Sequence, residues 1–93
     1  MAMTHVNGND KVKLSLYTLS TCIWCKMTKK LLNDLGVAYD FVDMDNLDGE
    51  EKENMLNELK RWNPKCSFPS LVVNDETCIV GYDDTKIKEA VGK

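Results

Sequence analysis

The sequence predicts one α/β domain in which strands and helices alternate along the chain. A length of 93 residues suits a single compact domain, and no stretch has the composition of a linker or repeats another. The composition, 43% apolar and 29% charged residues, is that of an ordinary globular protein. The spacing of the apolar residues switches between the strand and helix periods, and it predicts the order strand, helix, strand, helix, strand, strand, helix.

Residues 1–10 show no periodicity, and we expect a flexible lead there, followed by a single domain over 11–93. The one histidine, His5, lies in this lead and is given no role. The stretch "KVKLSLYT", which starts at Lys11, alternates apolar and polar residues. It predicts the first strand, with one face better buried than the other.

The first helix is predicted from about residue 23 to residue 35. Apolar residues recur there at spacings of three and four, namely Trp24, Met27, Leu31 and Leu35. Gly36 then ends the helix in the left-handed conformation, which glycine adopts without steric cost. The stretch that follows, "VAYDFVDM", is rich in β-branched and aromatic residues and predicts the second strand.

The second helix is predicted in "DGEEKENMLNELKRW", where Asp48 and Glu51 have the spacing of a capping box. Its apolar face consists of Met55, Leu59 and Trp62. Pro64 ends this helix, because proline lacks the N–H that the next backbone hydrogen bond needs.

The last part of the chain predicts a hairpin and a final helix. "SLVV" and "TCIVG" are short apolar strands on either side of the turn "NDE", so a hairpin is expected over residues 70–81. Asp83 or Asp84 can cap the helix that follows. Its inward residues are Ile87, Ala90 and Val91, and Gly92 lies at its end.

The net charge of −3 provides no broad basic surface, which disfavours nucleic acid as the main ligand. No apolar run approaches the roughly 18 residues that span a bilayer, and the polar first residues lack the apolar core of a signal peptide. We therefore expect a cytoplasmic protein that binds neither nucleic acid nor membrane. In a reducing cytoplasm, its four cysteines favour catalysis or metal binding over structural disulfides.

Cys22 and Cys25 form a C-x-x-C pair at the start of the first predicted helix. The thiolate is the attacking form of cysteine, and a free thiol with a pKa of ~8.5 is mostly protonated at neutral pH. Because the N–H groups at a helix start favour negative charge, Cys22 is the predicted nucleophile. Cys25, one turn further on, can attack the mixed disulfide at Cys22 and release the substrate. Lys26 and Lys29 can favour the Cys22 thiolate.

Three other interpretations of the cysteine pair stay open. Free cysteines are often inert and buried, so the pair can be structural. Zinc needs a second close pair, whereas Cys66 and Cys78 are separated by eleven residues and lie on a predicted loop and strand. Two chains can also share an iron–sulfur cluster, each through Cys22, with small thiols completing the ligation. Cys78 itself is expected to be a small buried hydrophobe.

Five stretches after Lys11 match one protein family. They are "LYT" at the end of the first strand, "TCIWC" at a helix start, "GVAYDFVDMD" as the second strand, "SFPSLVVND" before the hairpin and "VGYDD" before the last helix. On these stretches the chain resembles the glutaredoxins and the related electron donors of ribonucleotide reductase. The resemblance implies a thioredoxin-like fold of the order βαβαββα, with a small mixed four-stranded sheet flanked by helices. It also implies reversible thiol–disulfide exchange at Cys22 and Cys25.

The resemblance further implies a binding site beside the cysteine pair. Pro69 is expected to follow a cis peptide bond, although only about 5–6% of X–Pro bonds in folded proteins are cis. The backbone of Phe68 is expected to pair with a bound peptide or glutathione like an added strand. Further contacts with substrate or glutathione are assigned to Tyr17, Trp24, Lys65, Asp83 and Asp84.

Some of these residues have simpler explanations. Tyr17 can be a core residue with a solvated hydroxyl, and Lys65 an ordinary exposed lysine on a loop. Asp83 and Asp84 can serve only to cap the last helix.

Several positions depart from the usual glutaredoxin pattern. Leu19 stands where a lysine commonly draws the glutathione carboxylate, and Ile23 stands where a proline commonly follows the first cysteine. Val80 and Gly81 replace a pair of glycines, so a side chain crowds the place where a ligand backbone would approach. Cys66, shortly before the predicted cis-proline, can be a third active-site thiol or a spectator.

The sequence thus predicts a dithiol oxidoreductase that reduces protein disulfides, or mixed disulfides with glutathione, through Cys22 and Cys25. Its expected partners are disulfide-containing proteins and a reductant, which is either glutathione or a flavoprotein or ferredoxin-linked reductase. No tightly bound cofactor and no metal are expected, and we expect a monomer. The alternatives are an electron donor recharged by thioredoxin reductase or a ferredoxin-linked reductase instead of glutathione, and a non-enzymatic carrier of iron–sulfur clusters.

Overall fold

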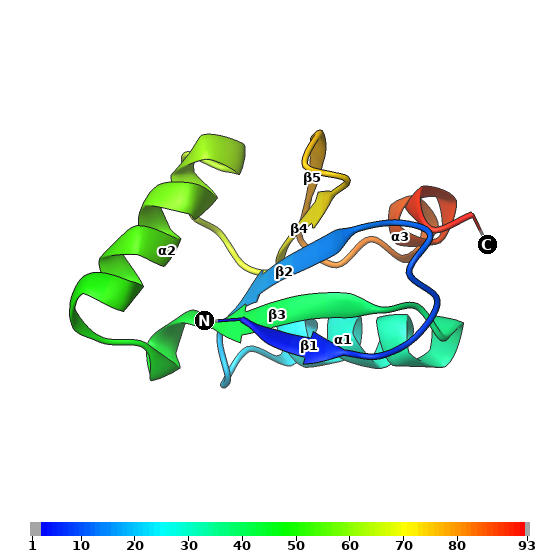
Figure 1. The fold of residues 1–93 in the computed structure, drawn as a ribbon, viewed down its shortest axis with the longest axis horizontal. Helices are drawn as coiled ribbons and strands as arrows, with labels where there is room; N and C mark the ends of the chain where they lie inside the picture. The colour runs from blue at the N-terminus through cyan, green and yellow to red at the C-terminus, as the bar shows by residue number, and fades with distance from the viewer. Residues whose placement is uncertain (1–2, 93) are drawn as a thin grey trace.

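The structure is a computed structural model that describes residues 3–92 (Figure 1). Its elements are β1 (Thr4–Val6), β2 (Leu14–Thr18), α1 (Ile23–Leu35), β3 (Tyr39–Asp43), the short 3₁₀ helix η1 (Met44–Asn46), α2 (Gly49–Trp62), β4 (Ser70–Val73), β5 (Thr77–Val80) and α3 (Asp84–Ala90). None of the helices within this range is both long enough and apolar enough to cross a membrane.

The strands form one mixed sheet in the order β1-β3-β2-β4-β5. β2 and β3 are parallel, with α1 as the crossover between them, and the other neighbouring pairs are antiparallel. From β2 onward the elements follow the predicted order. The sheet has five strands, however, and the prediction of four was wrong.

The extra strand, β1, lies in the segment that we expected to be a flexible lead. It pairs antiparallel with β3, from Thr4 opposite Phe41 to Val6 opposite Tyr39. Within it, His5, to which we gave no role, has its Nδ1 atom 2.7 Å from Oδ1 of Asp40. A strand of three residues is too short to show an alternation of apolar and polar residues, so the sequence did not predict it. Its conformation depends on pairing with the neighbouring strand.

Each face of the sheet has its own apolar cluster, because neighbouring residues of a strand point to opposite faces. Leu16 points to the face covered by α1 and α3, where it packs with Leu32 and Ile87. Tyr17 points to the face covered by α2, where it packs with Leu59. In Figure 1, α2 stands at one end of the sheet, well away from α1 and α3.

The helix ends follow local sequence signals at two places and depart from them at a third. Gly36, at φ 70°, ends α1 as predicted, and its N–H points at the carbonyls of Asn33 and Leu32. Asp83 caps α3 as predicted, since its Oδ1 accepts from the N–H of Lys86 at 3.1 Å. Asp48 is the N-cap of α2, but its side chain makes no capping hydrogen bond, so the predicted capping box is not formed.

The buried face of α1 differs from the apolar stripe of the sequence. Trp24 and Met27 were expected on that stripe, but they are 53% and 39% exposed. The residues that α1 buries are Cys25, Thr28 and Leu32. These buried positions follow Trp24, Met27 and Leu31 by one residue each, so the helix is rotated relative to the apolar stripe and the two large side chains remain exposed.

Candidate active site

The site begins in the loop that joins β2 to α1, where both cysteines of the pair lie. Cys22 is the N-cap of α1, with an extended backbone (φ −84°, ψ 119°), and its carbonyl accepts from the N–H of Lys26 at 3.1 Å. Cys25 lies in the first turn and is 0% exposed. Because Cys22 is only partly buried, a substrate sulfur can reach it while Cys25 stays covered.

The surroundings of Cys22 favour its thiolate. Burial by itself raises the pKa of this thiol, but a hydrogen bond from the Cys25 thiol and the N–H groups of Cys25 and Trp24 outweigh burial, and the pKa is lowered overall. The Cys22 sulfur makes no capping hydrogen bond of ordinary geometry. The N–H groups therefore act on it as dipoles at the start of the helix.

Cys25 has the opposite character. Burial raises its pKa to about 12, and the neighbouring Cys22 adds to the increase. Near neutral pH the Cys25 thiol therefore keeps its proton, which it can donate to the Cys22 thiolate. The more acidic and accessible thiol suits attack on a disulfide, whereas the buried thiol suits a later step.

A cis peptide bond joins Phe68 to Pro69, as the resemblance implied. The carbonyl of Pro69 accepts from the N–H of Gly81 at 2.8 Å, so the loop before β4 and the turn after β5 are held together. Between them and the start of α1 lies a hollow of about 290 Å³, which we call the small hollow. It is lined by Trp24, Phe68, Pro69, Gly81 and Tyr82.

An aromatic pair forms part of the wall of the small hollow. The rings of Trp24 and Tyr82 stack with their centroids 6.0 Å apart and an interplanar angle of 26°. Large apolar side chains are also exposed at the start of α1 and at the end of β5, namely Ile23, Trp24, Met27 and Val80. Sequence reasoning missed Tyr82, because only its position against Trp24 in space gives it a place in the site.

The lysines behind the cysteines have different surroundings. Lys26 is exposed, whereas Lys29 lies between α1 and β3 with its Nζ 3.0 Å from Oδ1 of Asp43. The same Nζ lies 4.2 Å from the centre of the Phe41 ring. Lys29 lowers the pKa of Cys25, a smaller effect than the opposing one of burial, so its charge acts on the second cysteine of the pair.

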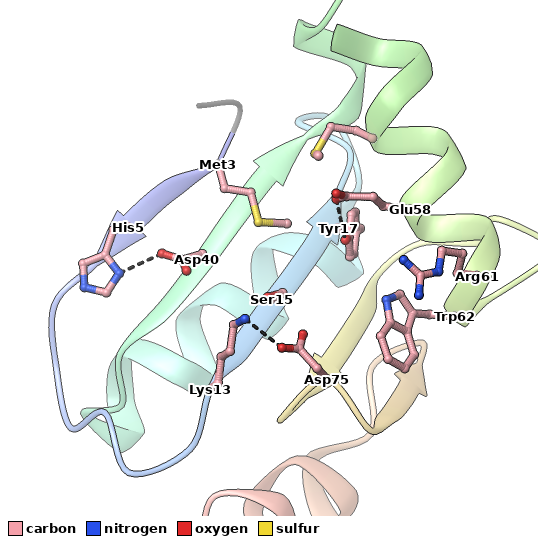
Figure 2. A pocket seen from close by; sticks show the side chains of 11 residues that line it. Met3, His5, Lys13, Ser15, Tyr17, Asp40, Glu58, Arg61, Trp62 and Asp75 are labelled. Atoms are coloured by element: carbon pink, nitrogen blue, oxygen red, sulfur yellow. Dashed lines mark hydrogen bonds and ion pairs between the residues drawn. The ribbon is translucent and has the colours of Figure 1, made fainter.

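The structure places Tyr17 apart from the small hollow. Its side chain lies on the α2 face of the sheet, where the hydroxyl donates to Oε2 of Glu58 at 3.5 Å (Figure 2). Burial first, and then the charge of Glu58, raise the pKa of Tyr17 to about 12. Tyr17 is 4% exposed, so it occupies a core position, as one of the two alternatives from the sequence expected.

Tyr17 instead lines a second and wider hollow of about 590 Å³, the large hollow, shown in Figure 2. Its walls come from β1, β2, β3, α2 and the turn between β4 and β5. Two polar contacts of 2.7 Å lie along it, a hydrogen bond between His5 and Asp40 and an ion pair between Lys13 and Asp75. Arg61 and Trp62 of α2 form the opposite wall.

The remaining predicted contact residues do not line the small hollow. Lys65 is exposed on the loop before the cis-proline, and Asp84 is exposed in the first turn of α3. Asp83, next to Tyr82, has its carboxylate engaged as the cap of α3. Their predicted roles in binding glutathione therefore stay predictions.

The other two cysteines lie on the α2 face. Cys66 adopts a left-handed backbone (φ 52°) and packs, partly buried, against the cluster that contains Leu59. Cys78 is also partly buried in that cluster, and burial raises the pKa of its thiol. Neither lines the small hollow. Within residues 3–92, no three His, Cys, Asp or Glu side chains are grouped so that they could hold a metal ion.

Comparison with known proteins gives the same family from sequence and from structure. A family model described as Glutaredoxin matches residues 14–78. The chain is 32% identical to glutaredoxin 1 of Rickettsia prowazekii over 78 residues, which cover 84% of this chain and 78% of the relative.

Solved structures agree over a longer span. The glutaredoxin of Methanosarcina mazei has a TM-score of 0.90 and 48% identity, with 100% of this chain and 90% of that chain covered. The methanoredoxin of Methanosarcina acetivorans has a TM-score of 0.89 and 50% identity, with 92% and 90% covered. These matches confirm the predicted thioredoxin-like α/β fold.

Proposed function

The chain belongs to the glutaredoxin family, and from this we propose that it is a dithiol oxidoreductase that reduces disulfides through Cys22 and Cys25. The observation that supports this most strongly is the contrast within the pair. The pKa of the accessible Cys22 is lowered, whereas that of the buried Cys25 is raised to about 12. A nucleophile and a resolving thiol need these two properties, respectively.

The proposed reaction has two exchanges. The Cys22 thiolate attacks one sulfur of a substrate disulfide, and that S–S bond breaks to release the first thiolate. Cys25 then loses its proton and attacks the Cys22 sulfur of the mixed disulfide. The bond between Cys22 and the substrate breaks, the second substrate thiolate leaves and takes up a proton, and Cys22 and Cys25 form a disulfide. The substrate has gained two electrons, and the enzyme has lost them.

We propose that the substrate lies along the cis-proline loop. The loop at Phe68 and Pro69 borders the small hollow next to the start of α1, so an extended segment that pairs with this backbone would bring its disulfide to Cys22. The lining of the small hollow is aromatic and apolar and includes no charged side chain. This favours a protein disulfide flanked by apolar residues as the substrate.

The reductant that recharges the pair is a separate question. Leu19 and Val80 stand where glutaredoxins commonly favour glutathione binding, and Val80 is 51% exposed next to the small hollow. Together with the uncharged lining, this favours a flavoprotein or ferredoxin-linked reductase over glutathione as the electron source. We keep glutathione as the alternative, with Lys65, Asp83 and Asp84 as the residues that would contact it.

One experiment tests both parts of this proposal. The oxidised protein is incubated anaerobically with glutathione, and separately with thioredoxin reductase and NADPH, and the free thiols at Cys22 and Cys25 are followed by mass spectrometry after alkylation. Fast reduction by the reductase with slow reduction by glutathione supports the proposal. Fast and complete reduction by glutathione would assign a conventional glutaredoxin instead. The reduced protein is then mixed with a protein disulfide. If it forms neither a mixed disulfide nor a disulfide between Cys22 and Cys25, the oxidoreductase assignment itself is refuted.

A further inference from the structure

The second exchange faces an obstacle in the structure, because Cys25 is fully buried and holds its proton tightly. In the reduced protein, burial and the neighbouring Cys22 both oppose a Cys25 thiolate. Once Cys22 is bound in a mixed disulfide, however, it carries no charge and its opposition disappears. Lys29 then remains as the positive charge that favours the Cys25 thiolate.

Lys29 is well placed for this effect. It follows Cys25 by four positions, so both side chains lie on the same side of α1. Long side chains on a helix lean toward its N-terminus, which here is the end that carries Cys25. Lys29 is only 23% exposed, so solvent screens its charge less than that of the lysines on the outer side of the helix.

Asp43 opposes Lys29 from the end of β3. Its Oδ1 accepts from Lys29 Nζ at 3.0 Å, and its side chain is only 16% exposed. The hydroxyl of the fully buried Thr18, its partner in the parallel register of β2 and β3, also donates to this oxygen. Asp43 is therefore fixed beside Lys29 and offsets part of its charge.

Other carboxylates to consider besides Asp43 belong to η1 and to the start of α3. Asp45, in η1, interacts with Lys29 and accepts from both the N–H and the hydroxyl of Ser20. Asp83 and Asp84 follow Tyr82, whose ring stacks on Trp24. Of these carboxylates, the one that forms an ion pair with Lys29 is Asp43.

We propose that Lys29 is a positioning residue for the second exchange, whose charge promotes attack by Cys25 on the mixed disulfide, and that Asp43 limits this charge. The inference rests on the proposed function, because it concerns the step that closes the disulfide between Cys22 and Cys25. It assigns Lys29 to that closing step, whereas the sequence had suggested that it favours the first attack.

The test separates the two exchanges in a single turnover. The probe is dithiobis(nitrobenzoate), a symmetric disulfide whose thiolate is coloured, mixed with reduced protein that carries Cys66→Ser and Cys78→Ser. Attack by Cys22 releases one coloured thiolate at a rate that depends on probe concentration. Attack by Cys25 then breaks the bond between Cys22 and the remaining half of the probe. It releases the second coloured thiolate at a rate independent of concentration.

The two variants are expected to act in opposite directions on the second phase. Lys29→Met should slow it about threefold, because a loss of thiolate is partly offset by the higher nucleophilicity of a more basic sulfur. Asp43→Asn should accelerate it by about the same factor, since Lys29 then acts without its counter-charge. Lys29→Arg should restore the wild-type rate. The pH at which the second phase reaches half its maximal rate should rise in Lys29→Met and fall in Asp43→Asn.

Matched controls come from the exposed pair Lys30 and Asp34 on the outer side of α1, 3.2 Å apart. Lys30→Met and Asp34→Asn remove the same charges from the same helix and should leave both phases unchanged.

If Lys29→Met and Asp43→Asn both slow the second phase, or neither changes it, the ion pair only holds α1 on the sheet and the inference is wrong. Should Asp43→Asn fold poorly, the comparison of Lys29→Met with Lys29→Arg decides alone. Absence of a concentration-independent second phase in the wild type would instead refute Cys25 as the resolving thiol, and with it the proposed function.

Discussion

Two hollows described above for residues 3–92 differ in size and lining, and the proposed chemistry lies beside the smaller one. The small hollow, of about 290 Å³, lies next to the cysteine pair and is lined by aromatic rings, a proline and a glycine. The large hollow, of about 590 Å³, is lined by five charged side chains together with histidine, aromatic, methionine and serine residues. Volume alone would direct attention to the large hollow instead.

The two hollows differ in whether their polar groups already have partners within the protein. In the large hollow the carboxylate of Asp40 is hydrogen-bonded to His5, that of Asp75 is paired with Lys13, and that of Glu58 accepts from Tyr17. At the small hollow, Cys22 sits at a helix start with its pKa lowered. A reactive group that its surroundings leave poised for reaction therefore identifies a site better than the size of the hollow. The predictions below compare the two hollows, from the largest expected effect to the smallest.

The largest effect is expected at the cysteine pair. Cys22→Ser should lower the rate of disulfide reduction by about a thousandfold or more, because the nucleophile is removed. Cys25→Ser should instead accumulate a mixed disulfide between Cys22 and the substrate, which intact-mass spectrometry detects. Glu58→Gln, in the large hollow, is the matched control and should keep the wild-type rate. A large loss of activity in Glu58→Gln with retained folding would mean that the large hollow takes part in the reaction.

The aromatic wall should have the next largest effect. Trp24→Ala or Tyr82→Ala should lower kcat/KM for a protein disulfide roughly fivefold, since a stacked aromatic pair is worth about 1 kcal/mol. The double variant should lose less than the product of the two single losses, because each substitution already removes the stack. Trp62→Ala, at the large hollow, should lower the free energy of unfolding and leave kcat/KM unchanged. Strictly multiplicative losses at Trp24 and Tyr82 would show that the two rings act independently.

Tyr17, which lines the large hollow, should affect the free energy of unfolding at alkaline pH. The pKa of Tyr17 is raised from 10.0 to about 12 in the folded protein, so the folded state holds this proton where the unfolded state has lost it. The contribution of Tyr17 is thus complete below about pH 10 and is lost as the pH rises toward about 12. Tyr17→Phe should show a shallower decline of the free energy of unfolding over that interval, measured by denaturant titration. An identical slope in both proteins would contradict the raised pKa.

The smallest effect is expected from the ion pair between Lys13 and Asp75 at the rim of the large hollow. The two side chains are 61% and 56% exposed, so water screens their attraction. A double-mutant cycle with Lys13→Ala and Asp75→Ala should give a coupling energy near the limit of detection, and it should decrease further with added salt. A large coupling that persists in salt would mean that the rim is more buried than its exposure indicates.

The elements that sequence reasoning located well are those that local signals define. The predicted bounds of α1 agree with the structure, because Gly36 is a local stop and adopts the left-handed conformation there. The cis bond before Pro69 was also expected correctly, but from the family resemblance and not from proline itself.

The features that sequence reasoning missed depend on contacts distant along the chain. Trp24 and Met27 were assigned to the apolar stripe of α1, yet the helix buries the neighbouring face that carries Cys25 and Thr28. Tyr82 belongs to the site only because its ring meets that of Trp24, 58 positions earlier. The ion pair of Lys29 with Asp43 likewise joins a helix to a strand, and spacing along the sequence cannot indicate it.

The edge strand β1 has a consequence for how the protein behaves in a crowded solution. By pairing with β3, it covers backbone N–H and C=O groups that would otherwise be free to pair with another chain. Just after β1, Gly8 passes close to the segment before β3, where a Cβ would lie 2.6 Å from the backbone carbon of Val37. Removing this segment would leave β3, of five residues, as the free edge in place of the three-residue β1, so we expect the shortened protein to self-associate more readily.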